Sequence, residues 1–388
     1  MTLQILETAD RPNCDQNMRG QWTGKASGTN TGTVIANFDE MTSHYQGVAY
    51  LLDDNGLIPS SAAFFRTENK NATFSFRAKI TPIDPKTGVF ANWDDIKQYF
   101  QPDVRMPEYA DISGSWQNDS MHLTWNTPLG TNGIMELKRS MADKASELIP
   151  VEKDWAGFKN YVAELECRRY LFRGQNSPWR LRTSFHRTGR ADLNRFLVED
   201  IQILHRHLSA RTKHVYNLQN PDENGAFFNL VQHHGYPTPL LDWTYSPYVA
   251  AFFAFRGISN EQAANADPGK KVRIHVFDQS QWKADWRQLH MVLAAAPHVS
   301  IGEYMAIENE RLIPQQAASS VTNLDDIESY IKSKEDINGK NYLRAIDMPV
   351  YERKKVVQEL NFMGITAGSL FPGLVGACEE LRERNFDI

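Results

Sequence analysis

The chain of 388 residues has little cysteine, no long apolar run and no excess of positive charge. Its three cysteines, Cys14, Cys167 and Cys378, lie far apart, and none has a partner at metal-ligand spacing, so we expect free thiols and no metal site. No stretch approaches the roughly 18 apolar residues that span a bilayer. The first residues lack a basic segment followed by an apolar one. We therefore expect a cytoplasmic protein with no membrane partner.

The net charge of −5 excludes a general electrostatic attraction to nucleic acid. A local basic face is still possible between residues 180 and 190, where four arginines accumulate beside a histidine. These residues are Arg180, Arg182, Arg187, Arg190 and His186. They form either the basic lip of a phosphate-binding cleft or a solvated loop with scattered arginines.

Residues 1–140 are expected to form a small antiparallel β-barrel or sandwich. Short aromatic and β-branched runs alternate there with glycine, asparagine and aspartate turns. Trp22 and Trp116 lie near the first and last of these runs, which suggests ends that close on each other. Such a barrel either fills itself with side chains or holds a ligand. We expect this domain to be regulatory or to recognise a target, through a ligand or a partner. The clearest strands span residues 33–38, 47–52 and 73–80.

A polar stretch that ends in a proline, residues 141–152, is expected to link this domain to a mixed domain over residues 153–388. Asp154 is expected to cap a helix. Residues 325–340 are so highly charged that we expect an exposed helix and loop there. The predicted fold class of the chain is therefore α+β.

Two stretches of the second domain are suited to bind an anion. Residues 170–175 read as a short buried strand that ends in Arg173 and Gly174, and an arginine held there can grip a phosphate or carboxylate. A structural arginine on an edge strand is the other interpretation. Asp242, Thr244 and Ser246 precede an apolar helix, with Ser246 as its N-cap, and a helix N-terminus favours negative charge. Asp242 is either a charged site residue or a cap.

Four motifs of the second domain, in this order, resemble those of the FRG-domain family. They are Phe172-Arg173-Gly174, Gln232-His233-His234-Gly235, Leu240-Leu241-Asp242-Trp243-Thr244, and Met363-Gly364-Ile365-Thr366 followed by Leu370-Phe371-Pro372. The resemblance covers roughly residues 155–384 and leaves out the N-terminal domain. The chain departs from the family at Pro239, where an arginine is usual, and at Ala317, where glycine usually follows two glutamines.

The order of the motifs is also similar to the three-part signature of ADP-ribosyltransferases. That resemblance implies NAD as a substrate. It implies that Arg173 grips the NAD phosphates and that Thr244 and Ser246 brace the nicotinamide ribose. One of Gln315, Gln316 or Glu310 would stand where that family has a catalytic glutamate. A glutamine can bond a ribose hydroxyl but carries no charge, so Glu308, Glu310 or Asp242 would have to supply it. The implied catalytic residues are Arg173, Thr244, Ser246, Gln316 and Glu310, and the implied NAD-binding residues are Phe172, Arg173, Gly174, Gln175, His234, Asp242, Trp243 and Thr244.

Two functions follow as hypotheses. The first is an ADP-ribosyltransferase-like effector that cleaves NAD and modifies a macromolecule, RNA, DNA or protein. The family resemblance implies a bacterial or phage toxin or an antiphage defence setting. The alternative is a non-catalytic FRG module that binds a nucleotide or nucleic acid as an interaction protein. A third reading is a structural partner recruited through the β-domain. A hydrolase is disfavoured because no serine or cysteine lies in a recognisable nucleophile motif.

Overall fold

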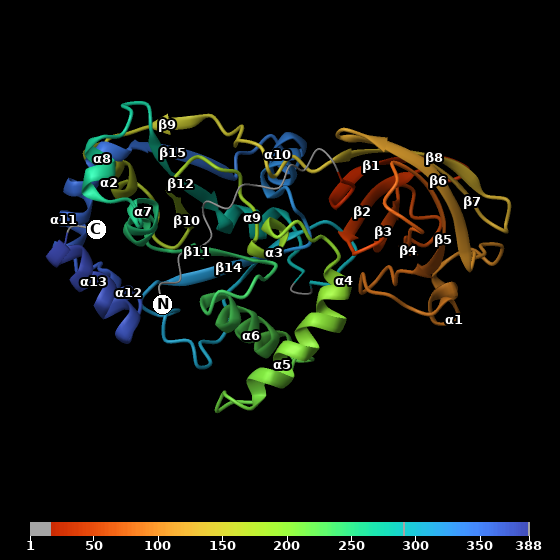
Figure 1. Cartoon of the computed structure of the whole chain (residues 1–388). Coiled ribbons are helices and arrows are strands. Elements are labelled where there is room, and N and C mark those ends of the chain that lie inside the picture. Colours follow the sequence, from red (N-terminus) through yellow and green to blue (C-terminus); the bar gives the residue numbers. More distant parts are fainter. Residues whose placement is uncertain (1–16, 290–291, 387–388) are drawn as a thin grey trace. The chain divides into compact units, whose positions relative to one another are not determined.

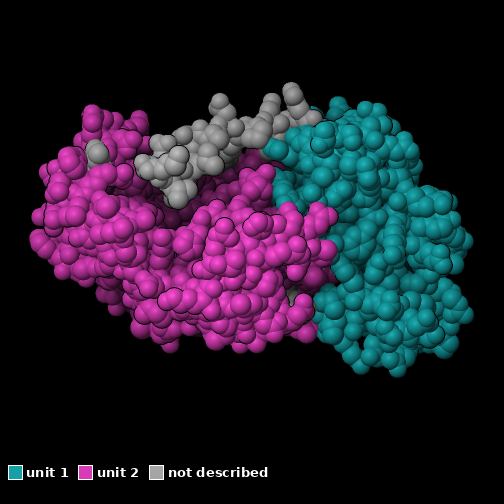
Figure 2. Space-filling view, turned by 60° about the horizontal axis from the view of Figure 1, so that its bottom comes forward, with its two compact units in different colours: residues 1–140, 189–196 teal, residues 141–188, 197–388 magenta. Residues whose placement is uncertain are grey.

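The computed structural model describes residues 17–289 and 292–386. The chain forms two compact units, coloured separately in Figure 2. Unit 1 comprises the residues up to Ser140 together with Gly189–Phe196, and unit 2 comprises Met141–Thr188 and the residues from Leu197 onward. Each unit has its own sheet and its own buried apolar core. The predicted α+β class is confirmed.

Unit 1 is a closed barrel of eight antiparallel strands joined in sequence order (Figure 1). β1 closes it by pairing with β8, where Gly24 lies opposite Leu137. A Cβ on Gly24 would lie 1.8 Å from the carbonyl oxygen of Glu136, so this seam favours glycine. The expected barrel or sandwich is therefore a barrel. Its strands are β1 (Gly20–Gly28), β2 (Gly32–Glu40), β3 (Tyr45–Asp53), β4 (Ser61–Arg66), β5 (Thr73–Pro82), β6 (Tyr109–Gln117), β7 (Ser120–Asn126) and β8 (Asn132–Arg139), with α1 (Trp93–Ile96) and η2 (Lys97–Tyr99) between β5 and β6.

The core of unit 1 joins aromatic side chains from strands that are distant in sequence. The rings of Trp22 and Trp116 meet edge to face with their centroids 6.5 Å apart. The guanidinium carbon of Arg139 lies 4.3 Å from the centroid of the Trp22 ring. These contacts bring together the two tryptophans that marked the ends of the β-rich region. Whether the barrel also takes a ligand or a partner stays a prediction.

Asp39 on β2 binds a later part of unit 1. Its side chain is 1% exposed. It accepts hydrogen bonds from Arg190 Nε at 2.9 Å and from the backbone amides of Ala191 and Asp192 at 2.9 and 3.2 Å. A buried carboxylate is stable where several donors replace its lost hydration. Asp39 therefore fixes the segment Gly189–Phe196 within unit 1.

Unit 2 is built on a seven-stranded sheet with β10 near its centre (Figure 1). Neighbouring strands are antiparallel except β15 and β9, which are parallel. β9 lies inside the segment expected to link the domains. In spatial order the strands are β13 (Val299–Gly302), β14 (Ala317–Thr322), β11 (Leu240–Thr244), β10 (Tyr170–Gln175), β12 (Lys271–Asp278), β15 (Leu343–Pro349) and β9 (Pro150–Glu152).

The helices that bound the candidate site begin at side-chain caps. Asp154 caps α2 and Ser246 caps α7, as the sequence predicts. The helices from Met141 onward are α2 (Trp155–Ala163), α3 (Ser184–Arg187), α5 (Ile201–Ser209), α6 (Pro221–His233), α7 (Pro247–Phe255), α8 (Asn260–Ala264), α9 (Gln279–Asp285), α10 (Ile327–Asn338), α11 (Arg353–Phe362), α12 (Ala367–Leu370) and α13 (Leu374–Phe386), with η4 (Val350–Glu352) before α11; α4 (Leu193–Arg195) belongs to unit 1, and η3 (Phe196–Asp200) follows it.

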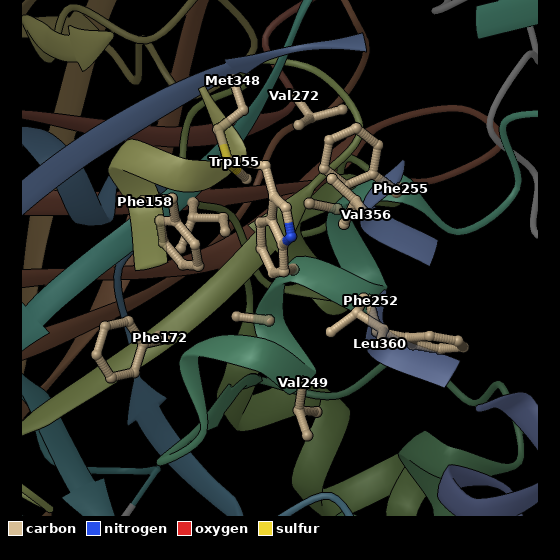
Figure 3. Close-up of a cluster of buried hydrophobic side chains, with 14 of the residues drawn as sticks. Trp155, Phe158, Phe172, Val249, Phe252, Phe255, Val272, Met348, Val356 and Leu360 are labelled. Atoms are coloured by element: carbon tan, nitrogen blue, oxygen red, sulfur yellow. The ribbon is translucent and has the colours of Figure 1, made fainter. Parts of the chain in front are cut away.

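The main core of unit 2 lies where α7 packs on β10 (Figure 3). Phe172 of β10 and Phe252 of α7 are both buried in this cluster. A Cβ on Gly174 would lie 1.9 Å from the carbonyl oxygen of Ala250 in α7. Glycine at this position therefore allows the helix backbone to rest directly on the strand. The close approach also fixes the strand on which Arg173 lies.

Candidate functional site

Three adjacent strands place Phe172 and Thr244, two of the expected site residues, on one row of the sheet, and Arg173 and Gln316 flank this row on opposite sides. Phe172 on β10 lies directly opposite Thr244 on β11, and Thr244 lies opposite Ala317 on β14. Arg173 follows Phe172 by one residue, and Gln316 precedes Ala317 by one. Positions that are about 70 residues apart in sequence thus become backbone neighbours.

Arg173 is held against β11 by its own side chain. One residue pair joins β10 and β11, and Arg173 Nη1 donates to the carbonyl oxygen of Asp242 at 2.7 Å. Arg173 Nε is buried and has no hydrogen-bond partner among the described residues. No ion pair joins Arg173 to a carboxylate in the part of the chain that the structure describes, so the guanidinium keeps donors for another group.

The electrostatic surroundings of Arg173 are unusual for an arginine. Burial lowers the pKa of its guanidinium to about 10, the charge of Asp242 opposes this change, and Arg187 adds to it. His275 of β12 lies directly opposite Arg173 in the sheet. Burial also lowers the pKa of His275, although Glu328 opposes the change. An anion beside Arg173 would offset the cost of burying its charge.

Asp242 is a strand residue and caps no helix. Its Oδ1 accepts a hydrogen bond from Gln232 Nε2, and Gln232 Oε1 in turn accepts one from Thr238 Oγ1. Gln232 belongs to the motif at the end of α6. Two of the expected motifs therefore meet at the Asp242 carboxylate, which is half-buried.

The hydroxyl groups of Thr244 and Ser246 are occupied within the fold. Thr244 Oγ1 donates to the carbonyl oxygen of Gln315 at 2.7 Å and accepts from the Ser246 amide at 3.0 Å. Ser246 Oγ accepts from the Val249 amide at 3.2 Å, which completes the N-cap of α7. Both residues are buried. They shape the turn from β11 into α7, and Ser246 Oγ acts only as an acceptor in the hydrogen bonds of the described residues.

The third expected position is split between a buried and an exposed glutamine. Gln315 is buried, and its Nε2 donates to the carbonyl oxygen of Leu370 at 2.9 Å. Gln316 is exposed and has a left-handed backbone with φ of +47°. Glu310 is exposed as well, and none of the described contacts joins its side chain to Arg173 or Thr244. Gln316 lies just outside the row, where its carbonyl oxygen accepts from the Tyr245 amide at 3.0 Å, and Glu310 stays outside the row as well.

The other expected binding residues have mixed positions. Phe172 and Trp243 are buried in two different cores, and Trp243 Nε1 donates to Ser320 Oγ at 3.0 Å. Gln175 Nε2 donates to the carbonyl oxygen of Trp179 at 2.9 Å. His234 is exposed at the end of α6. These aromatic residues and Gln175 therefore support the strand ends, while His234 faces solvent.

Most of the arginines of the expected basic lip have acidic partners. Arg180 pairs with Asp326 at 2.8 Å, and Arg182 pairs with Asp325 at 2.5 Å. Arg190 belongs to unit 1 and pairs with Asp39 at 2.9 Å. Arg187 is exposed and acts electrostatically on Arg173. The basic run thus contributes mainly structural ion pairs.

A buried polar network next to Arg173 escaped the sequence analysis. His275 Nε2 lies 3.4 Å from Glu328 Oε1, and Glu328 also accepts hydrogen bonds from the Leu181 amide and from Ser146 Oγ. Glu328 lies on α10, which was expected to be exposed, and is 4% exposed. The expectation of an exposed helix was wrong on this face because local charge content does not reveal distant donors.

Residues 168–263 match the family model of the FRG domain. The chain contains an FRG domain. No curated protein and no solved structure matches the chain. The FRG match includes Arg173, Thr244 and Ser246 and ends before the loop that carries Glu310 and Gln316.

The described residues offer neither a membrane-spanning helix nor a metal-binding cluster. None of the helices there is long and apolar enough to cross a membrane. Across residues 17–289 and 292–386, no group of three or more histidine, cysteine, aspartate or glutamate side chains is placed to hold a metal ion.

Proposed function

We propose that the FRG domain binds NAD and transfers ADP-ribose to a macromolecular acceptor. The row Phe172, Thr244 and Ala317 across β10, β11 and β14 carries this proposal. These three strands carry or adjoin an arginine, a hydroxyl segment and a polar turn, in the sequence order that the resemblance to ADP-ribosyltransferases implies. The acceptor is RNA, DNA or protein, and the setting is cytoplasmic toxin action or antiphage defence. The barrel serves as the regulatory or target-recognition domain.

Arg173 would hold the pyrophosphate of NAD. The guanidinium is half-buried, is fixed by the Asp242 carbonyl and has an unsatisfied Nε. Phosphate oxygens match the fork of donors on arginine. Because the site already carries the desolvation cost of the cation, an arriving phosphate gains a strong electrostatic partner.

The Asp242 carboxylate would supply the negative charge that this reaction needs. Breaking the bond between ribose C1′ and nicotinamide passes through an oxocarbenium-like state. Nicotinamide leaves with the bonding electron pair, and C1′ bonds to an acceptor nucleophile that loses its proton. Gln316 has no charge to stabilise this state, and Glu310 lies outside the row. Asp242 is the carboxylate whose charge acts on Arg173, and Gln232 orients it.

A second candidate function is nucleotide binding without turnover. It is favoured by the engagement of Thr244 and Ser246, whose hydroxyl groups serve the fold. In this case Arg173 would still hold a phosphate, and no bond would break. The two candidates share the phosphate and differ in the release of nicotinamide.

Nicotinamide release from NAD separates these candidates. The full chain would be incubated with NAD and with RNA, DNA or cell extract, and ADP-ribose binding would be measured in parallel by calorimetry. We expect release by the wild type and loss of both release and binding in Arg173→Gln. Arg344→Gln is a matched control, because Arg344 is also half-buried and lies on β15 of the same sheet. Binding without release would favour the second candidate. The absence of both binding and release would reject both candidates.

A further inference from the structure

The loop before β14 carries a second arginine that the proposed site does not use. Arg311 Nη1 donates to the carbonyl oxygen of His233 at 2.8 Å, at the end of α6. Capping this helix end is the ordinary role of such an arginine. The hydrogen bond occupies one of five N–H donors. Arg311 forms no ion pair with a carboxylate of the described residues, so capping leaves most of its donors available.

The surroundings of Arg311 have an excess of positive charge. Its guanidinium carbon lies 5.4 Å from the ring centroid of Phe371, and that of Arg256 lies 4.1 Å from the same centroid. Glu379 binds Arg256 through two hydrogen bonds of 2.6 and 2.8 Å. Burial and the charge of Arg256 lower the pKa of Arg311, while Glu379 opposes the change. One carboxylate thus serves two guanidinium groups.

A buried amide near Arg311 also favours a ligand that accepts hydrogen bonds. Asn309 is 4% exposed, and its Oδ1 lies 2.8 Å from His233 Nδ1. Its Nδ2 has no hydrogen-bond partner within the described parts of the chain. A buried donor without a partner is destabilising, because it has lost its hydration and gained no hydrogen bond. An acceptor bound here would remove that cost.

His234 completes the group of donors. It is exposed, and partial burial, Arg311 and His233 lower the pKa of its ring in that order. A neutral imidazole has one N–H to donate. Arg311 and His234 therefore offer donors at the surface, and Asn309, two residues before Arg311, adds a buried donor.

We infer that Arg311, Asn309 and His234 form an anion subsite that takes a phosphate group. Two hydrogen-bonded paths connect the subsite to the strands that carry the proposed NAD site. The Arg311 carbonyl accepts from the Gln315 amide at 3.2 Å, and the Gln315 carbonyl accepts from Thr244 Oγ1. The second path runs through α6. Arg311 binds the carbonyl oxygen of His233, and the preceding residue, Gln232, donates to Asp242 Oδ1.

The phosphate is either that of a nucleotide or a free inorganic anion. Its assignment to a nucleotide rests on the proposed function, whereas the subsite itself does not. Both sources present oxygen acceptors and negative charge, so the same three donors recognise them. Arg173 and Arg311 would then hold separate anionic groups of the ligand or of its acceptor.

Binding of inorganic phosphate and of ADP-ribose to the full chain tests the subsite. Calorimetry on Arg311→Gln should show at least about tenfold weaker binding of phosphate, because a charge-assisted hydrogen bond contributes more than 1.4 kcal/mol. Arg344→Gln should bind like the wild type, since Arg344 has equal burial and a ring contact of 5.6 Å. His234→Gln, an exposed change, keeps the test valid if Arg311→Gln fails to fold.

The two ligands identify the source of the phosphate. Weaker binding of both to Arg311→Gln assigns the subsite to the nucleotide, and weaker binding of phosphate alone assigns it to a free anion. Unchanged binding of both, or an equal loss in Arg344→Gln, would overturn the subsite. Phosphate binding that depends on Arg311 without any nicotinamide release would reject the proposed enzyme and retain the subsite. Nicotinamide release with unchanged phosphate binding in Arg311→Gln would reject the subsite and retain the proposed enzyme.

Discussion

Arg173 Nη1 donates a hydrogen bond of 2.7 Å to the main-chain carbonyl of Asp242. This contact joins the central strand to its neighbour at the place where the two strands share one residue pair. The same guanidinium is thus both a structural link and the candidate grip for an anion. The two roles are compatible, because the link uses Nη1 and leaves Nε without a partner among the described residues.

Replacing Arg173 by lysine should separate these roles. Arg173→Lys keeps the positive charge and loses the planar fork. We expect ADP-ribose binding at least about tenfold weaker, with a free energy of unfolding lowered by about 1 kcal/mol for the lost hydrogen bond. Calorimetry and denaturant unfolding measure the two effects. Binding equal to the wild type would exclude Arg173 as the phosphate ligand.

Gly174→Ala should destabilise unit 2. The new Cβ would meet the Ala250 carbonyl oxygen at 1.9 Å. The Cβ is fixed to the strand backbone and the carbonyl belongs to the helix backbone, so neither can rotate away. Overpacking of this kind costs about 1–3 kcal/mol or more. Gly269→Ala is the control, because its Cβ would meet a flexible aspartate side chain. Equal free energies of unfolding for the two variants would show that α7 does not rest on the strand as described.

Asp242→Asn tests the source of negative charge in the proposed reaction. Asparagine can still accept a hydrogen bond from Gln232, so the local fold should persist. We expect nicotinamide release to fall by about 10²-fold or more, as for removal of one group that stabilises charge in the transition state. ADP-ribose binding should change far less. A rate equal to that of the wild type would assign the charge to another residue.

Asp192→Asn should change how the stability of unit 1 depends on pH. Burial, with a contribution from Asp39, raises the pKa of Asp192 from 3.8 to about 6. The native state therefore holds this proton more tightly than the unfolded state, so the free energy of unfolding falls as pH rises from about 4 to 6. The ionised side chain costs about 3 kcal/mol above pH 6.

The variant should remove that loss of stability. Asparagine keeps the N-cap bond that Asp192 makes to the Arg195 amide, and it cannot ionise. Asp192→Asn should therefore be more stable than the wild type at pH 7 and nearly equal to it at pH 4. Denaturant unfolding at the two pH values measures this, and parallel curves for the two proteins would contradict the raised pKa.

The local pattern of the sequence predicts where strands and helices form far better than it predicts which strands lie side by side in the sheet. Turn residues between short apolar runs indicate the β-domain, and Ser246 before Pro247 marks the start of α7. The sheet of unit 2 places β10 between β11 and β12, which follow it by about 70 and 100 residues. Strand order of this kind depends on tertiary packing, so no local pattern reveals it.

The same limit applies to the surroundings of the polar residues. Residue type marked Thr244 and Ser246 as polar, but their hydrogen bonds to the fold depend on where Gln315 and Val249 lie. Glu328 looked like a surface charge because its partner His275 is distant in sequence. Arg311 has one signal in the sequence, a cation in the loop between two site motifs, but its neighbour Glu310 is the residue type that the resemblance implies there.

The most direct test of the account is nicotinamide release from NAD by the full chain, with wild type, Arg173→Gln and Arg344→Gln compared at equal concentration. The account predicts release by the wild type and by Arg344→Gln, and a loss of at least about 10²-fold in Arg173→Gln. A wild-type protein that releases no nicotinamide with RNA, DNA or extract present, or Arg173→Gln that releases it at the wild-type rate, would contradict this claim.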